Sequence, residues 1–190
     1  MNDWTSNKKT LILIGVLILI LVGILLVETL PKKEPGVPGD TISPLFKTKI
    51  GQTTDNNLSS QPDLLKKTAA DGQTVYTFKP TSNLVGNQVI TEGGKAVFEK
   101  GTILEQQSKL LLYSDYVSKY GKPETAFAGS KTYGKFEKTY TYASLGFALK
   151  VNPFTQEVDE VQKFAPTTTE EYLKKWGDDI TSFVEIKEQF

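Results

Sequence analysis

The chain lacks cysteine, histidine and arginine, and its 22 basic residues, all lysine, balance 22 acidic ones. Without cysteine no disulfide can form, and without cysteine or histidine there is no thiolate or imidazole to hold a metal. Serine–histidine and cysteine–histidine nucleophile pairs are excluded as well. Zero net charge and the lack of arginine disfavour nucleic-acid binding. We therefore expect no metal, no cofactor and no nucleic-acid partner.

One long apolar run stands near the start, TLILIGVLILILVGILLV, residues 10–27, with neither charge nor proline. As a helix it would span roughly 27 Å, about the thickness of the hydrocarbon core of a membrane. A cleaved signal peptide would be shorter and would end in a small-x-small site, which the following residues, ETLPKKEP, do not contain. The run predicts a head over 1–9 and a single-pass anchor over 10–28, with the lipid bilayer as partner through residues 10–27.

The orientation of this anchor is less constrained, because pairs of lysines flank the run on both sides. The short head favours a cytoplasmic N-terminus, which would place the rest of the chain on the extracytoplasmic side of the cell membrane. Residues 29–61 are rich in proline at first and then polar without periodicity, which is typical of a linker. A folded domain is predicted over 62–190.

The domain repeats a phrase: YVSKYG at 116–121 returns as YLKKWG at 172–177. Strand patterns precede each copy: 73–80, 88–91 and 95–100 before the first, and 137–144, 146–151 and 157–164 before the second. The pattern predicts an α+β fold, an antiparallel sheet built from two strand–strand–strand–helix units, 73–121 and 136–177, with both helices on one face. Chance similarity of two amphipathic modules is the alternative. Gly121 and Gly177 are predicted to end the helices with a positive φ.

A family likeness rests on the same residues, a helix followed by YGKPE, an aromatic strand, and then GFALKV and EVDEVQKF. This order resembles the modules of β-lactamase-inhibitor-like proteins, whose fold the small outer-membrane assembly lipoproteins share. The resemblance covers roughly 62–190 and implies modules in tandem that bind other proteins and catalyse nothing. Here an apolar run stands in place of the lipoproteins' lipid-attachment cysteine, and no functional residue is carried over.

Catalytic candidates are few. The carboxylate pairs Asp159–Glu160, Glu157–Asp159 and Asp178–Asp179 could in principle act as acid and base on a glycan, but their sequence context predicts solvated side chains with ordinary pKa values. Serine–lysine pairs such as Ser118–Lys119 and Ser130–Lys131 lack a sign of a buried lysine. We expect no catalytic residue.

Aromatic residues crowd the second unit, and the stretch Gly129–Lys138 has the glycine and aromatic content of an exposed binding loop. Packing in the core is the alternative for these side chains. We expect Tyr133, Phe136 and Phe154 to contribute to a contact surface. The sequence thus predicts a membrane-anchored, non-catalytic binding or scaffold domain with a protein partner in the cell envelope. A cell-envelope hydrolase that uses a carboxylate pair is the alternative.

Overall fold

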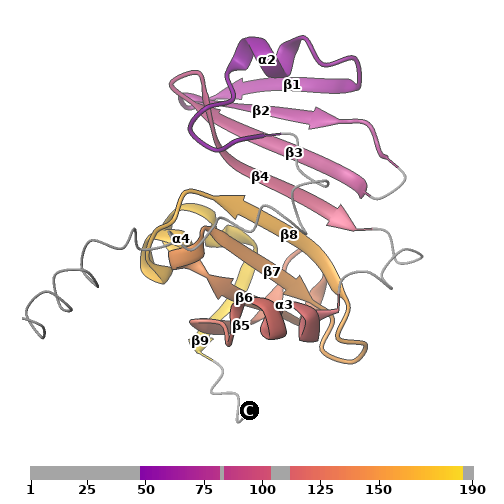
Figure 1. Cartoon of the computed structure of the whole chain (residues 1–190), viewed down its shortest axis with the longest axis vertical. Coiled ribbons are helices and arrows are strands. Elements are labelled where there is room, and N and C mark those ends of the chain that lie inside the picture. The colour runs from indigo at the N-terminus through magenta and orange to yellow at the C-terminus, as the bar shows by residue number, and fades with distance from the viewer. Residues whose placement is uncertain (1–47, 82–83, 104–111, 186–190) are drawn as a thin grey trace, which may run out of the picture. The chain divides into compact units, whose positions relative to one another are not determined.

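The computed structural model describes residues 48–81, 84–103 and 112–185, all within one compact unit of the chain, Val37–Phe190 (Figure 1). Its strands are β1 (Leu64–Ala70), β2 (Gln73–Phe78), β3 (Leu84–Glu92), β4 (Lys95–Ile103), β5 (Thr125–Ser130), β6 (Gly134–Tyr142), β7 (Phe147–Val151), β8 (Val158–Phe164) and β9 (Ile180–Glu185). Its helices are α2 (Asp55–Ser59), α3 (Tyr113–Tyr120) and α4 (Thr169–Trp176), with short 3-10 turns η3 (Ala143–Leu145) and η4 (Gly177–Asp179).

All nine strands belong to one antiparallel sheet in the order β1-β2-β3-β4-β8-β7-β6-β5-β9. Two meanders, β1–β4 and β5–β8, lie side by side and are joined where β4 pairs with β8, for example Phe98 with Phe164. The last strand, β9, then pairs with β5. Figure 1 shows the two meanders as the purple-to-pink and orange halves of the sheet.

Local sequence explains the two-residue turn between β3 and β4. Gly93 and Gly94 join β3 to β4 with φ of 55° and 78°. A hairpin turn with two positive φ angles matches the twist of the flanking strands and strongly favours glycine. On β2, Tyr76 and Phe78 point to the same buried face because side chains alternate along a strand.

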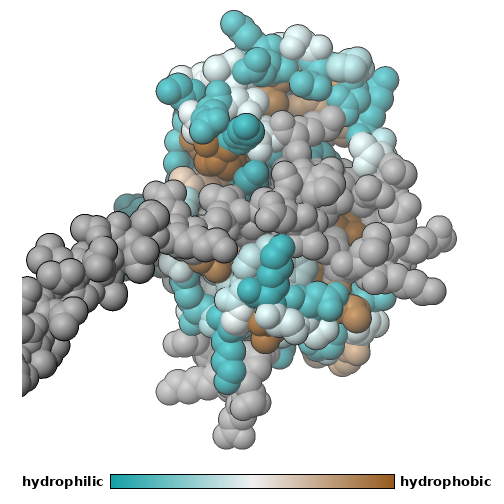
Figure 2. Space-filling model, in the orientation of Figure 1, coloured by the Kyte–Doolittle hydropathy of each residue, from teal (hydrophilic) through white to brown (hydrophobic). Residues whose placement is uncertain are grey.

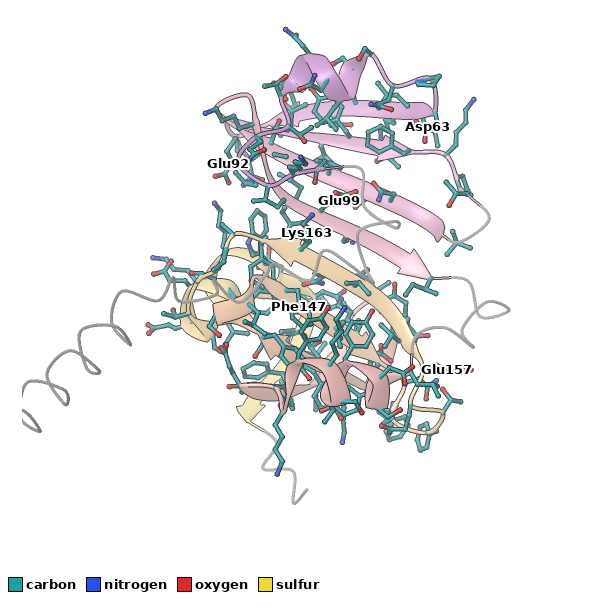
Figure 3. All side chains as sticks on the ribbon, in the orientation of Figure 1. Asp63, Glu92, Glu99, Phe147, Glu157 and Lys163 are labelled. Carbon is teal, nitrogen blue, oxygen red and sulfur yellow. The ribbon has the colours of Figure 1, made fainter. Side chains whose placement is uncertain are left out.

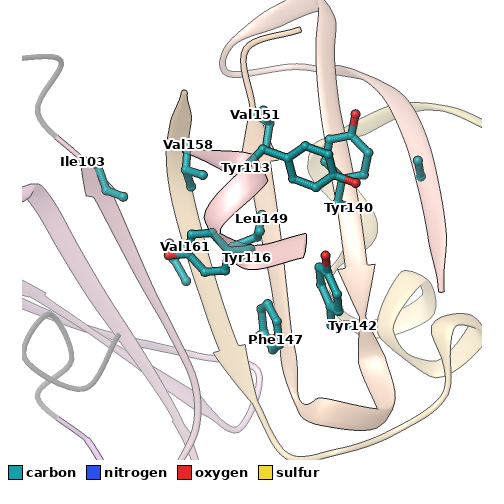
Figure 4. Close-up of a cluster of buried hydrophobic side chains, with 11 residues drawn as sticks. Ile103, Tyr113, Tyr116, Tyr140, Tyr142, Phe147, Leu149, Val151, Val158 and Val161 are labelled. Carbon is teal, nitrogen blue, oxygen red and sulfur yellow. The ribbon is translucent and has the colours of Figure 1, made fainter. Parts of the chain in front are cut away.

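One face of the second meander is covered by α3, and it is named here the α3 face. Tyr113 and Tyr116 of α3 pack on alternate residues of β6 and β7, among them Tyr140 and Phe147, as Figure 4 shows. The rings of Tyr113 and Tyr140 stack with centroids 4.0 Å apart. Burial of each large side chain of this kind stabilises the fold by about 1.5–3 kcal/mol.

The opposite face is covered by α4 and is named the α4 face. Tyr172 of α4 belongs to a cluster with Ala148, which alternates with Phe147 along β7 and therefore points away from α3. Trp176 stacks on Phe98 with centroids 4.4 Å apart. The predicted α+β arrangement with both helices on one face is thus wrong: the structure is mostly one nine-stranded antiparallel sheet with few helices, and these two helices lie on opposite faces.

The predicted units need a second correction. Three antiparallel strands precede a helix in each, β2–β4 before α3 and β6–β8 before α4, but the sheet also contains β1, β5 and β9, which the prediction omits. Gly121 ends α3 with φ of 81°, as predicted. Gly177 has φ of −79° and begins η4, so α4 ends without a left-handed glycine. At its start, α4 is capped by Thr168, whose side chain accepts a hydrogen bond from the backbone of Glu171.

The predicted linker, 29–61, extends too far. Thr48 is buried, and its backbone N–H and hydroxyl both donate to Glu99, which also accepts a 2.8 Å hydrogen bond from Asn87. Lys163 donates to the Thr48 carbonyl oxygen over 2.9 Å, and Figure 3 labels Glu99 and Lys163 on the neighbouring strands β4 and β8. Residues 48–61, with helix α2 and its buried Leu58, are therefore part of the fold, because a buried carboxylate holds them to the sheet.

The expected transmembrane helix is not found in the part of the chain that the structure describes. No helix within 48–81, 84–103 or 112–185 is long and apolar enough to cross a membrane. The predicted head and anchor, 1–28, and the first part of the predicted linker lie outside these residues.

Candidate functional site

Two phenylalanines form an exposed aromatic pair, called here the aromatic patch. Phe136 on β6 is 58% exposed and Phe154 in the β7–β8 turn is 76% exposed, and their rings meet edge to face with centroids 5.6 Å apart. Among the described residues three other large apolar side chains are exposed, Leu65, Val85 and Leu112. On the side drawn in Figure 2, the brown hydrophobic areas are small and separated by teal hydrophilic residues.

The backbone around the patch is fixed. Asn152 accepts a 3.0 Å hydrogen bond from the backbone N–H of Phe154, and Gln156 closes the same turn with φ of 61° and a 2.8 Å bond to the Asn152 carbonyl. Phe136 lies on β6 between Gly134 and Lys138, which both pair with β5. The ammonium of Lys135 lies 4.8 Å from the centre of the Phe136 ring. The patch is therefore an apolar surface with a cation at its border, held on a rigid scaffold.

Tyr133, the third residue predicted for this surface, lies elsewhere. It is half-buried on the α4 face, where its hydroxyl donates to Glu160 over 3.2 Å and the Lys150 ammonium lies 5.4 Å from its ring centre. The stretch 129–138 is not one exposed loop, because β5 and β6 extend into it and leave a three-residue turn. The structure brings Phe136 and Phe154 together and separates Tyr133 from them.

A second feature lies on the α4 face and is called the buried ion cluster, made of Lys150, Glu160 and Asp179. Lys150 on β7 is 2% exposed and donates to an Asp179 carboxylate oxygen, while Glu160 Oε1 on β8 lies 3.6 Å from the Lys150 Nζ. Glu160 is 1% exposed. A lysine is almost never fully buried unless it is paired, and here two carboxylates pair it.

Neutral donors surround both carboxylates. Gln162 donates to Glu160 Oε1 over 2.7 Å. Asp179 Oδ1 accepts the backbone N–H of Thr132 over 3.0 Å and the Thr132 hydroxyl over 2.6 Å, and Ser130 donates to Oδ2. Ser130 therefore acts as a hydrogen-bond partner of Asp179 in this structure.

Carboxyl pKa values near this cluster move in opposite directions. Burial works to raise the pKa of Asp179, but hydrogen bonds from Lys150, Ser130 and Thr132 outweigh it and hold the pKa at about 2. Burial raises the pKa of the neighbouring Glu137 to about 8, and the charge of Asp159 adds to this rise while the Lys150 ammonium opposes it.

The lowered pKa of Asp179 and the burial of Glu160 contradict the expectation that these two carboxyls are solvated and have ordinary pKa values. Sequence reasoning missed Lys150 and Glu137 altogether. The available signal was the position of Lys150 and Glu160 within strands made mostly of apolar residues. A lone charge is unfavourable in such a strand, whereas a paired charge is tolerated.

A pocket of about 330 Å³ opens beside α4, where β8 leaves β4. Phe164, Trp176 and Lys175 contribute to its wall, together with backbone and side chains of 50–51, 96–97 and 165–167. Glu171 is the one carboxylate in its lining, and Lys175 forms a 2.8 Å ion pair with Glu92. The buried ion cluster and the aromatic patch do not line this pocket.

No protein-family model, no curated protein and no solved structure matches this chain.

Proposed function

We propose that the domain is a non-catalytic protein-binding module and that the aromatic patch forms part of its contact surface. The observation that carries this proposal is the edge-to-face contact of two phenylalanines that are both more than half exposed. Aromatic side chains are enriched at protein–protein interfaces relative to the rest of the surface.

The energetics support a contact at this place. Covering a phenylalanine that is exposed in the free domain is worth up to about 1.5–3 kcal/mol, so two rings together can anchor a partner. The rings are already paired and sit on a paired strand and a hydrogen-bonded turn. Binding therefore needs little ordering of side chains or loops, so less of the contact energy is offset by lost conformational entropy.

The alternative, a hydrolase with a carboxylate pair, has less support. Acid–base hydrolysis of a glycan needs two carboxyls about 5–9 Å apart on either side of a bound substrate. The pocket beside α4 has a single carboxylate in its lining, Glu171. The carboxyls with shifted pKa values, Glu92, Glu137 and Asp179, lie outside that lining. The extracytoplasmic location of the domain and its envelope partner stay predictions from the sequence.

The test compares two double variants of the full chain. Phe136→Ala with Phe154→Ala removes the patch, while Leu65→Ala with Val85→Ala removes two other exposed apolar side chains from the first meander. Both should keep the stability of the wild type within about 1 kcal/mol, because all four side chains are exposed. Each immobilised protein is offered a detergent extract of the envelope of the source cells, and bound proteins are quantified by mass spectrometry.

We expect the wild type and the Leu65/Val85 variant to retain the same partner, and the Phe136/Phe154 variant to lose it by tenfold or more, about 1.4 kcal/mol. Equal capture by all three folded proteins would exclude the patch as a contact. Unfolding of the Phe136/Phe154 variant alone would show that the two rings stabilise the domain itself, and the proposal would be wrong.

A further inference from the structure

The buried ion cluster places the amine of Lys150, which is 2% exposed, in direct contact with the carboxyl of Asp179, which is 23% exposed, next to the buried carboxyl of Glu160. We propose that Lys150 and Asp179 condense into an intramolecular amide bond, with Glu160 as the catalytic residue that transfers the proton. The crosslink would join β7 to the turn η4 that leads into β9. This modification is independent of the binding function proposed above.

The two reacting groups are already in place. The Lys150 Nζ donates to Asp179 Oδ2, so the amine nitrogen lies beside the carboxyl carbon that it would attack. Each group is held from its own side: Lys150 projects from a strand that is paired on both edges, and Asp179 accepts hydrogen bonds from Ser130 and Thr132. Fixing two reactants in contact removes much of the entropic barrier that a reaction between free groups would face.

Hydrogen-bond donors already contact the Asp179 oxygen that gains negative charge in this reaction. Oδ1 of Asp179 accepts the backbone N–H of Thr132 at 3.0 Å and the Thr132 hydroxyl at 2.6 Å. Two fixed donors on one oxygen form the arrangement that stabilises a tetrahedral oxyanion in acyl transfer. Ser130 contacts the other oxygen, Oδ2, which is the one that leaves.

Glu160 is placed to move the proton. Its Oε1 lies 3.6 Å from Nζ, and Gln162 and Tyr133 hold the carboxylate by hydrogen bonds of 2.7 Å and 3.2 Å. Glu160 and Lys150 are 1% and 2% exposed, so bulk water has little access to exchange protons with them.

The reaction balances without any other reagent. A proton passes from the ammonium to Oδ2 along their hydrogen bond and leaves a neutral amine beside a carboxylic acid. This first transfer is uphill, because hydrogen bonds from Lys150, Ser130 and Thr132 hold the pKa of Asp179 at about 2. Nζ then forms a bond to the carboxyl carbon, and the electron pair of the C=O bond moves to Oδ1. Glu160 accepts a proton from Nζ and returns it to Oδ2, the C–O bond breaks, and one water leaves. An ammonium and a carboxylate become a neutral amide, which removes two charges from a buried site where charges are unfavourable.

The first experiment needs no variant. The full chain is purified, denatured and weighed by intact mass spectrometry, and its tryptic digest is searched for a branched peptide. We expect the mass to be lower than the sequence mass by one water molecule, and the fragments to join Lys150 to Asp179. A chain that keeps its full mass after prolonged incubation of the folded protein would overturn the proposal, and so would a missing water that maps to any other residue.

Variants then test the roles. Lys150→Arg should restore the full mass, because a guanidinium does not act as the nucleophile here. Glu160→Gln should leave the chain uncrosslinked or slow bond formation about 100-fold or more, since a positioned proton carrier contributes at least that factor. Glu92→Gln breaks the solvent-exposed ion pair with Lys175 and should crosslink like the wild type. Crosslinking at the wild-type rate in folded Glu160→Gln would show that the role given to Glu160 is wrong.

Discussion

Replacing Gly146 with alanine tests how closely residue 146, which follows η3, approaches the backbone at the end of β8. Gly146 has φ of 79°, which an L side chain adopts at a cost of about 1–2 kcal/mol. A Cβ there would also lie 2.6 Å from the carbonyl oxygen of Phe164 and 3.2 Å from the Pro166 ring. Both neighbours belong to the main chain or to a rigid ring, so the clash can be relieved only by a backbone shift. Overpacking of this kind destabilises the fold by about a further 1–3 kcal/mol.

We therefore expect Gly146→Ala to lower the free energy of unfolding by about 2–5 kcal/mol, a shift of the urea midpoint by about 1–2 M. Gly72→Ala is the matched control, because Gly72 has φ of 78° and a Cβ there would meet nothing within 4 Å. It should lose only the conformational part, about 1–2 kcal/mol. Equal losses in the two variants, measured by urea unfolding followed by tryptophan fluorescence, would refute the contact between residue 146 and the Phe164 carbonyl.

Glu137→Gln should flatten the pH dependence of stability. The Glu137 carboxyl has a pKa of about 8 in the folded protein against an ordinary value of 4.5, so the wild type loses stability as pH rises through that interval. Equal slopes of unfolding free energy against pH, from urea titrations of both proteins, would contradict this. Glu99→Ala should destabilise the fold by about 2–4 kcal/mol because it leaves the buried donors of Thr48 and Asn87 without their carboxylate. Calorimetry measures that loss, and a change below 1 kcal/mol would mean that residues near 48 contribute little to stability. Gly121→Ala should cost about 1–3 kcal/mol at a φ of 81° and ψ of −168°, and an unchanged melting temperature would show that α3 ends in another way.

Strand positions could be predicted wherever side chains alternate. Tyr76 and Phe78 marked β2, and Phe147, Leu149 and Val151 marked β7, because one strongly apolar face leaves a period of two in the sequence. The edge strand β1 has six exposed residues out of seven and therefore carries no such period. Strand β5 reads TAFAGS, whose alanines and glycine are poor strand formers, so the sequence does not predict it, and its last two residues fall in the stretch predicted as an exposed loop.

The faces of the helices could not be predicted in the same way. Both sides of β7 are buried, and Ala148 and Lys150 between its large apolar residues gave no sign of a second packed layer. The burial of Lys150 could not be predicted because its partners, Glu160 and Asp179, come from a different strand and a distant turn. For the aromatic patch the sequence identified Phe136 and Phe154 but not the burial of Tyr133, which depends on the direction of a three-residue turn.

The pairing of β4 with β8 also has a consequence for the order in which the chain folds. Each meander is a continuous stretch of chain with short turns. Pairing its strands therefore costs little chain entropy and can proceed quickly. The β4–β8 ladder instead joins residues far apart in the chain, and Phe98 and Phe164 meet only when both meanders exist. We therefore expect that ladder to form last, and until it forms the facing edges of β4 and β8 are unpaired and open to pairing with another chain.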